Sequence, residues 1–79
     1  MYEKDRKLMR EIGSGYQNGR YSDKKLTEGI ERSEAIVEEL MLKINNSTLG
    51  ENITEKELDE LWDVLNEWEN TKKWLIDMK

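Results

Sequence analysis

The side chains in this sequence that could do chemistry are almost all carboxylates. The 79 residues include 18 aspartates and glutamates, and neither histidine nor cysteine. Serine–histidine and cysteine–histidine pairs are therefore excluded, and the commonest metal ligand is missing. The carboxylates recur at helix-surface spacing, without the apolar pocket that raises a catalytic pKa. We expect no catalytic residue, no metal site and no cofactor, and interpret the chain as a binding protein rather than an enzyme.

The tryptophans are the residues best suited to bind a partner. Trp62, Trp68 and Trp74 are spaced by six residues, so at about 100° per residue they cannot share one helix face. Trp74 falls almost opposite the apolar seam of its helix, and an exposed tryptophan is a typical hot spot of a protein interface. The predicted partner-binding residues are Trp74, Met78, Asp63, Glu67 and Asp77.

In a competing interpretation, the N-terminal segment of the same chain packs over Trp74. The N-terminal segment offers Leu8, Met9 and Ile12 as apolar contacts, and its cations could meet the acids around Trp74. Those cations are Lys4, Lys7 and Arg10. A homodimer contact would bury Trp74 equally well.

A second candidate set lies in the glycine-rich segment near the N-terminus. Its residues are Tyr16, Arg20, Tyr21 and Lys24. Aromatic and basic side chains in a flexible segment can stack on bases and contact phosphates, so a small nucleotide-like ligand is one option. A plain linker is the other. The net charge of −5 argues against direct binding of nucleic acid.

Charge is unevenly distributed along the chain. Residues 1–25 carry seven basic and four acidic side chains, whereas residues 26–79 carry six basic and fourteen acidic ones. The acids form stripes along the two long predicted helices. Such stripes are typical of a solvated face, and they also suit a protein that occupies the basic cleft of a nucleic-acid-handling protein.

The elements that must position these residues are helical. We predict a short helix over residues 2–12, with a glycine-rich linker completing an arm over 1–21, then helices over 22–45 and 54–79 joined by a turn over 46–53. The second long helix has the clearest start, because Thr54 and Glu57 form a capping box and Ile53 and Leu58 a hydrophobic staple. Helix-forming residues dominate, phenylalanine is absent and β-branched residues are scattered, so strands are improbable.

The predicted fold class is all-α, a single domain over residues 1–79. The two long helices form an antiparallel hairpin whose mutual surface is too small to be stable alone. Either the N-terminal arm docks to give a three-helix bundle, or two hairpins pair as a dimeric four-helix bundle. We slightly favour the homodimer.

The location and function of the protein are predicted from its overall length, charge and composition. The charged N-terminus is not a signal peptide, no window is apolar enough to span a membrane, and the cytoplasm of a bacterial host is the expected compartment. In profile the chain resembles small accessory proteins of phages and mobile elements, including anti-CRISPR and other anti-defence or host-takeover proteins. That resemblance implies an inhibitor that binds a partner protein, such as a nuclease. The alternatives are a homo-oligomeric assembly subunit and a small nucleotide-ligand binder.

Overall fold

The capping signals of the sequence coincide with the helix starts in the structure. The computed structural model describes residues 1–79 and contains α2, Asp23–Asn45, and α3, Glu55–Asp77. At the start of α3 the Glu57 amide donates to Thr54 Oγ1 at 3.2 Å, and the Thr54 amide donates to the Glu57 carboxylate at 3.2 Å. The predicted capping box is therefore confirmed, and it satisfies two backbone donors that the helix leaves without partners.

The N-terminal helix is longer than predicted. Helix α1 spans Glu3–Gln17, so the expected linker over residues 13–21 is wrong for its first five positions. The glycines serve close packing instead of breaking the helix: a Cβ on Gly13 would lie 2.6 Å from Trp74 Cζ3, and one on Gly15 would lie 2.6 Å from Tyr21 Cε2. The chain leaves the helix only at Asn18, and Gly19 follows with a φ of 77°.

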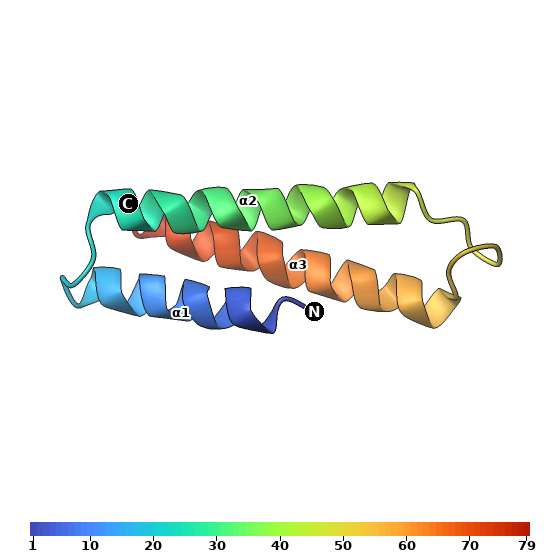
Figure 1. Ribbon diagram of the computed structural model, residues 1–79, viewed down its shortest axis with the longest axis horizontal. Helices are drawn as coiled ribbons and strands as arrows, with labels where there is room; N and C mark the ends of the chain where they lie inside the picture. Colours follow the sequence, from blue (N-terminus) through green and yellow to red (C-terminus); the bar gives the residue numbers. More distant parts are fainter.

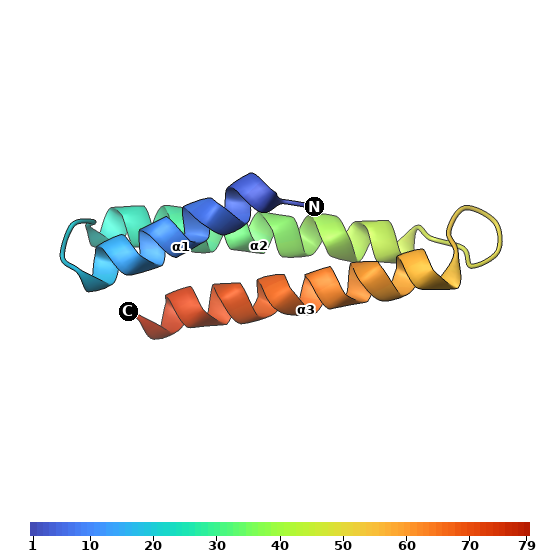
Figure 2. The ribbon, with the colours of Figure 1, turned by 90° about the horizontal axis from the view of Figure 1, so that it is seen from below.

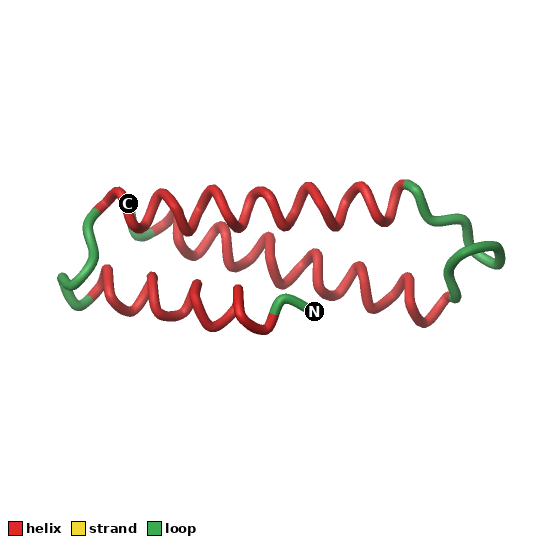
Figure 3. The backbone as a smooth tube through the Cα atoms, in the orientation of Figure 1, coloured by secondary structure: helices red, strands yellow, loops and turns green.

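The three helices pack as an all-α bundle, as predicted. Helices α2 and α3 form the antiparallel hairpin, α1 lies against them, and the two connecting loops lie at opposite ends (Figures 1 and 3). Of the two predicted arrangements, the structure shows α1 docked as a third helix. None of the helices contains a stretch that is both long and apolar enough to cross a bilayer.

The core is continuous across all three helices. Helix α1 contributes Met9 and Ile12, and Trp68 of α3 is fully buried among residues of α2. Gly29 of α2 lies where both other helices come close, since a Cβ there would lie 3.2 Å from Ile12 Cδ1 and 3.5 Å from Leu75 Cδ1. The small-residue notch of α2 therefore admits both neighbouring helices.

Helix α1 covers only part of the hairpin. It has 15 residues, whereas α2 and α3 have 23 each, and a difference of eight residues corresponds to about 12 Å of helix. Figure 2 shows the N-terminus near the middle of the elongated molecule, which measures 49 × 17 × 16 Å. We call the uncovered half, residues 38–64, the open end.

Candidate protein-binding surface

The predicted hot spot, Trp74, packs against α1. Its ring lies over Gly13, and the side chain remains 42% exposed. Trp74 lines a small groove between α1 and α3 together with five other residues, Arg6, Met9, Arg10, Glu67 and Thr71. The N-terminal segment thus contacts Trp74, which is the arrangement that the competing interpretation required.

Ion pairs hold α1 against both long helices. The Arg6 guanidinium donates two hydrogen bonds to Glu67 of α3, one of them 2.8 Å long. The Arg32 guanidinium of α2 donates two to Asp5, at 3.0 and 3.2 Å. The hydrogen bond to Glu67 raises the pKa of Arg6, and that to Asp5 raises the pKa of Arg32. Lys4, Lys7 and Arg10 were the cations expected at the acids around Trp74, but Glu67 is bound by Arg6, whose planar guanidinium can donate two parallel hydrogen bonds to one carboxylate.

The structure does not gather the five predicted partner-binding residues into one exposed patch. Glu67 is paired with Arg6, and Met78 is half-buried against the core. Asp77 is exposed at the end of α3. Asp63 is also exposed, but it lies 11 residues before Trp74 in the same helix, about 16 Å along the axis. Only Asp63 belongs to the open end.

The second predicted set forms the turn between α1 and α2. The Tyr16 hydroxyl donates to Asp23 at 2.7 Å, and this hydrogen bond raises the pKa of Tyr16. The Tyr21 ring lies against Gly15 and has the Arg20 guanidinium and the ammonium of Lys25 each 5.9 Å from its centroid. Lys24 is exposed. Both tyrosines and Arg20 therefore make local contacts that pack the turn.

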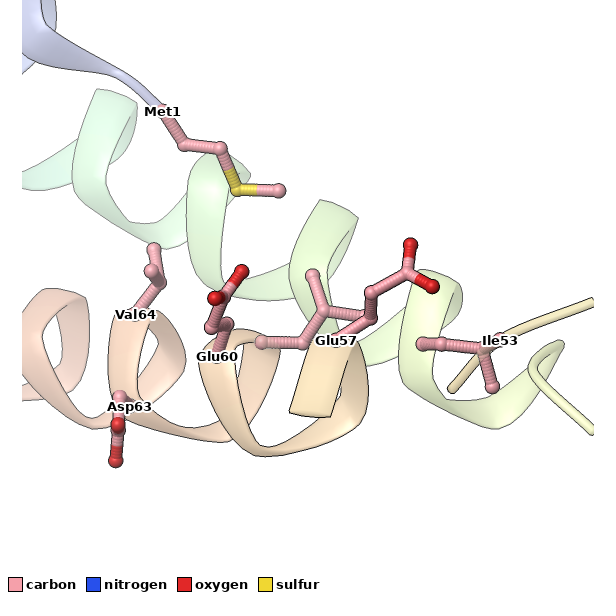
Figure 4. Close-up of a pocket in the computed structure, with 7 residues that line it drawn as sticks. Met1, Ile53, Glu57, Glu60, Asp63 and Val64 are labelled. Atoms are coloured by element: carbon pink, nitrogen blue, oxygen red, sulfur yellow. The ribbon is translucent and has the colours of Figure 1, made fainter. Parts of the chain in front are cut away.

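A groove at the open end was not predicted from the sequence. It has a volume of about 400 Å³ and lies beyond the N-terminus of α1, along the first half of α3. Its apolar lining comes from Met1, Ile53, Leu61 and Val64, and its acidic lining from Glu57, Glu60 and Asp63. In Figure 4, Val64 and Glu60 point from α3 toward the side on which Met1 lies, and the Met1 side chain extends above Glu60. The place of Met1 depends on how α1 docks, so local sequence patterns contain no signal for this groove.

The acids around the groove form no ion pairs. Residues 55–63 include five carboxylates and a single lysine, and none of the five takes part in the ion pairs of the structure. Glu55 and Glu57 stabilise α3, because their negative charges lie at the positive end of the helix dipole. Asp59, Glu60 and Asp63 lie beyond the first turn, so the helix dipole does not account for their presence.

Large apolar side chains are also exposed at the open end. They are Met41, Leu42, Leu49 and Trp62. Two of them, Met41 and Leu42, line a second shallow depression together with Glu38 and Asn45. Unpaired acids and exposed apolar groups therefore occur together on the half of the hairpin that α1 leaves uncovered. No group of three or more acidic residues is arranged to hold a metal ion.

Tyr2 closes the core at the boundary of the open end, and it gives a prediction about alkaline pH. Its ring meets Trp68 edge to face at 5.9 Å, and its buried hydroxyl makes no hydrogen bond of ordinary geometry. Burial raises the pKa of Tyr2, and the Glu39 carboxylate adds to the rise. The unfolded chain therefore ionises first, so this contribution to stability is present below pH about 10 and is lost as the pH rises further.

We expect Tyr2→Phe to change the free energy of unfolding by less than about 1 kcal/mol at pH 7, because the hydroxyl makes no hydrogen bond of ordinary geometry, even to its neighbour Glu39. Above pH 10 the variant should lose stability less steeply than the wild type. Urea unfolding followed by circular dichroism at both pH values measures the difference. Parallel pH profiles for the two proteins would contradict the role given to Tyr2.

Comparison with protein-family models, with curated proteins and with solved structures found no match to this chain.

Proposed function

We propose that this chain is a non-enzymatic binding protein whose open end engages a basic surface of a second protein. The observation that carries the proposal is the run of unpaired carboxylates on α3, at Asp59, Glu60 and Asp63, beside the exposed apolar groove. Apolar contacts at an interface increase affinity, whereas complementary charges speed association and select the partner.

The charge pattern favours a particular class of partner. Proteins that handle nucleic acids have basic clefts that attract phosphates. An acidic helical surface can enter such a cleft and exclude the nucleic acid, so we propose inhibition of a nucleic-acid-handling protein as the biological outcome. The net charge of −5 would repel nucleic acid itself, which supports a protein as the direct partner.

A homo-oligomeric assembly subunit is the second candidate, because the same exposed residues could pair two copies. Trp62 and Met41 are 47% and 46% exposed, and burying both would favour association. Light scattering on a sizing column at several concentrations distinguishes the two functions. A dimer that persists on dilution favours the assembly subunit, and a monomer favours the binding protein.

The proposed function is tested by capture of cellular proteins on the immobilised chain. A triple variant, Asp59→Asn, Glu60→Gln and Asp63→Asn, removes two unpaired acids that line the groove and a third beside them on α3, and leaves Glu57 in the capping box. The control variant carries Glu11→Gln, Glu31→Gln and Glu34→Gln, which are equally exposed and form no ion pair.

We expect the wild type and the control to retain a basic protein that the triple variant retains about tenfold less well, with a loss of binding at high salt. A nucleic acid added in excess should compete if the partner handles nucleic acids. Equal retention by all three proteins, or no specific retention by the wild type, would contradict the proposal.

A further inference from the structure

We propose that the groove at the open end is a docking site for a basic amphipathic helix of the partner protein, seated in line with α1. This inference rests on the proposed function and specifies the site and the secondary structure that it recognises. The helix would act as the third helix of the open end, where the protein supplies only two.

The geometry of the bundle defines the vacant position. Helix α1 starts at Glu3, packs mainly against α2 and meets the C-terminal half of α3 through the Arg6–Glu67 pair and the contact of Gly13 with Trp74. The groove begins at Met1 and continues along α3 past Val64, Leu61 and Glu57 to Ile53 (Figure 4). A helix placed there needs about 12 Å of contact, or roughly two turns, to reach the end of the hairpin.

Burial along the seam of α3 falls as the cover by α1 ends. Trp68 and Leu75, opposite α1, are fully buried, whereas Leu65 is 4% and Leu61 8% exposed. Val64 and Ile53 are half-buried and pack at the edge of the core. The apolar seam therefore continues into the groove, where Leu61 is still buried and Val64 and Ile53 leave part of their apolar surface for a docked helix to cover.

The charge stripe on α3 indicates which kind of helix fits. Glu60, Asp63 and Glu67 have the spacing i, i+3 and i+7, so they lie on one side of α3. Glu67 already receives Arg6 from α1, which shows how a cation on the third helix meets this stripe. Glu60 and Asp63 line the groove and form no ion pair, and the Met1 ammonium at its edge is paired with Glu3 instead. Lys43 of α2 is engaged with Glu39 and lies over the Tyr2 ring.

The probe for this proposal is a synthetic amphipathic helix of about 14 leucines and lysines, which is long enough to span the groove at about 1.5 Å per residue. A peptide with glutamates in place of the lysines is the matched control. Fluorescence anisotropy of the labelled peptide measures affinity, and methyl NMR shifts of Ile53, Leu61 and Val64 locate the bound peptide.

We expect the leucine–lysine peptide to bind one chain and to shift these methyl signals, and the leucine–glutamate peptide not to bind. The charge reversal Glu60→Lys with Asp63→Lys should weaken binding about tenfold or more, because two attractions become repulsions. The matched reversal Glu31→Lys with Glu34→Lys should change affinity by less than about threefold. All four positions are exposed, so circular dichroism should show intact helices in both variants.

Three results would overturn the docking site. Equal weakening by the two reversals would show diffuse attraction to an acidic chain. Unshifted methyl signals would place the peptide elsewhere. Self-association that shifts the same methyl groups without peptide would show that a second copy occupies the groove. A partner captured through the acids of α3 would still support the proposed function after any of these results, and loss of both capture and peptide binding would remove both proposals.

Discussion

Replacement of Trp68 by alanine is expected to unfold the protein at room temperature. The indole is fully buried and lies in the cluster that joins all three helices, with the Tyr2 ring at 5.9 Å. Truncation of a buried tryptophan costs about 3–5 kcal/mol, through lost transfer energy and the cavity left behind. A small domain has only about 5 kcal/mol of stability at the lower end of the usual range, so the loss is comparable with the whole.

Trp62→Ala is the matched control for this prediction. It removes the same side chain from the same helix, but Trp62 is 47% exposed and should cost about 1 kcal/mol or less. Urea unfolding followed by helical circular dichroism gives both values. Similar, small losses for the two variants would show that the core does not centre on Trp68.

The second large effect is expected from Gly13→Leu. Any side chain at this position would overlap the Trp74 ring, so either the ring or the whole of α1 must move. Leucine favours a helix more than glycine does by about 0.8 kcal/mol, but overpacking of this size costs about 1–3 kcal/mol. We expect a net loss of stability, together with detachment of the C-terminal half of α1 from α3.

Tryptophan emission should shift to longer wavelength in this variant as Trp74 becomes more hydrated, and amides of α1 should exchange faster with solvent. Ser14→Leu provides the control, because it adds the same side chain to the next residue of α1, which is exposed. It should leave emission and exchange close to those of the wild type. A Gly13→Leu variant with unchanged emission would show that Trp74 does not depend on Gly13 for its place.

The elements with strong local signals were predictable from the sequence. The capping box at Thr54 depends on residues three apart, and the seam from Leu58 to Leu75 repeats with the helical period. Both are set by contacts near in sequence, so pattern and propensity suffice to find them. The hairpin then follows from two such helices and a short turn.

Most residues of the candidate site could not be predicted from such local patterns. Of the groove residues, only Asp63 was among the predicted partner-binding residues, and it was grouped with Trp74, which contacts α1 instead. A helical projection shows on which side of α3 a residue lies, but not whether another helix covers that side. The cover is a property of the docked α1, and the groove exists where that cover ends.

The amino-acid sequence by itself determined the class of fold, the two long helices, the segregation of charge and the lack of histidine and cysteine chemistry. Only the tertiary structure decided the role of the glycines in α1 and the partial exposure of Val64 and Ile53 at the open end. Gly13 reads locally as a helix breaker, because its cost in a lone helix is entropic. In the bundle the same residue lets Trp74 approach α1, and contacts between residues 61 positions apart in sequence outweigh the local preference.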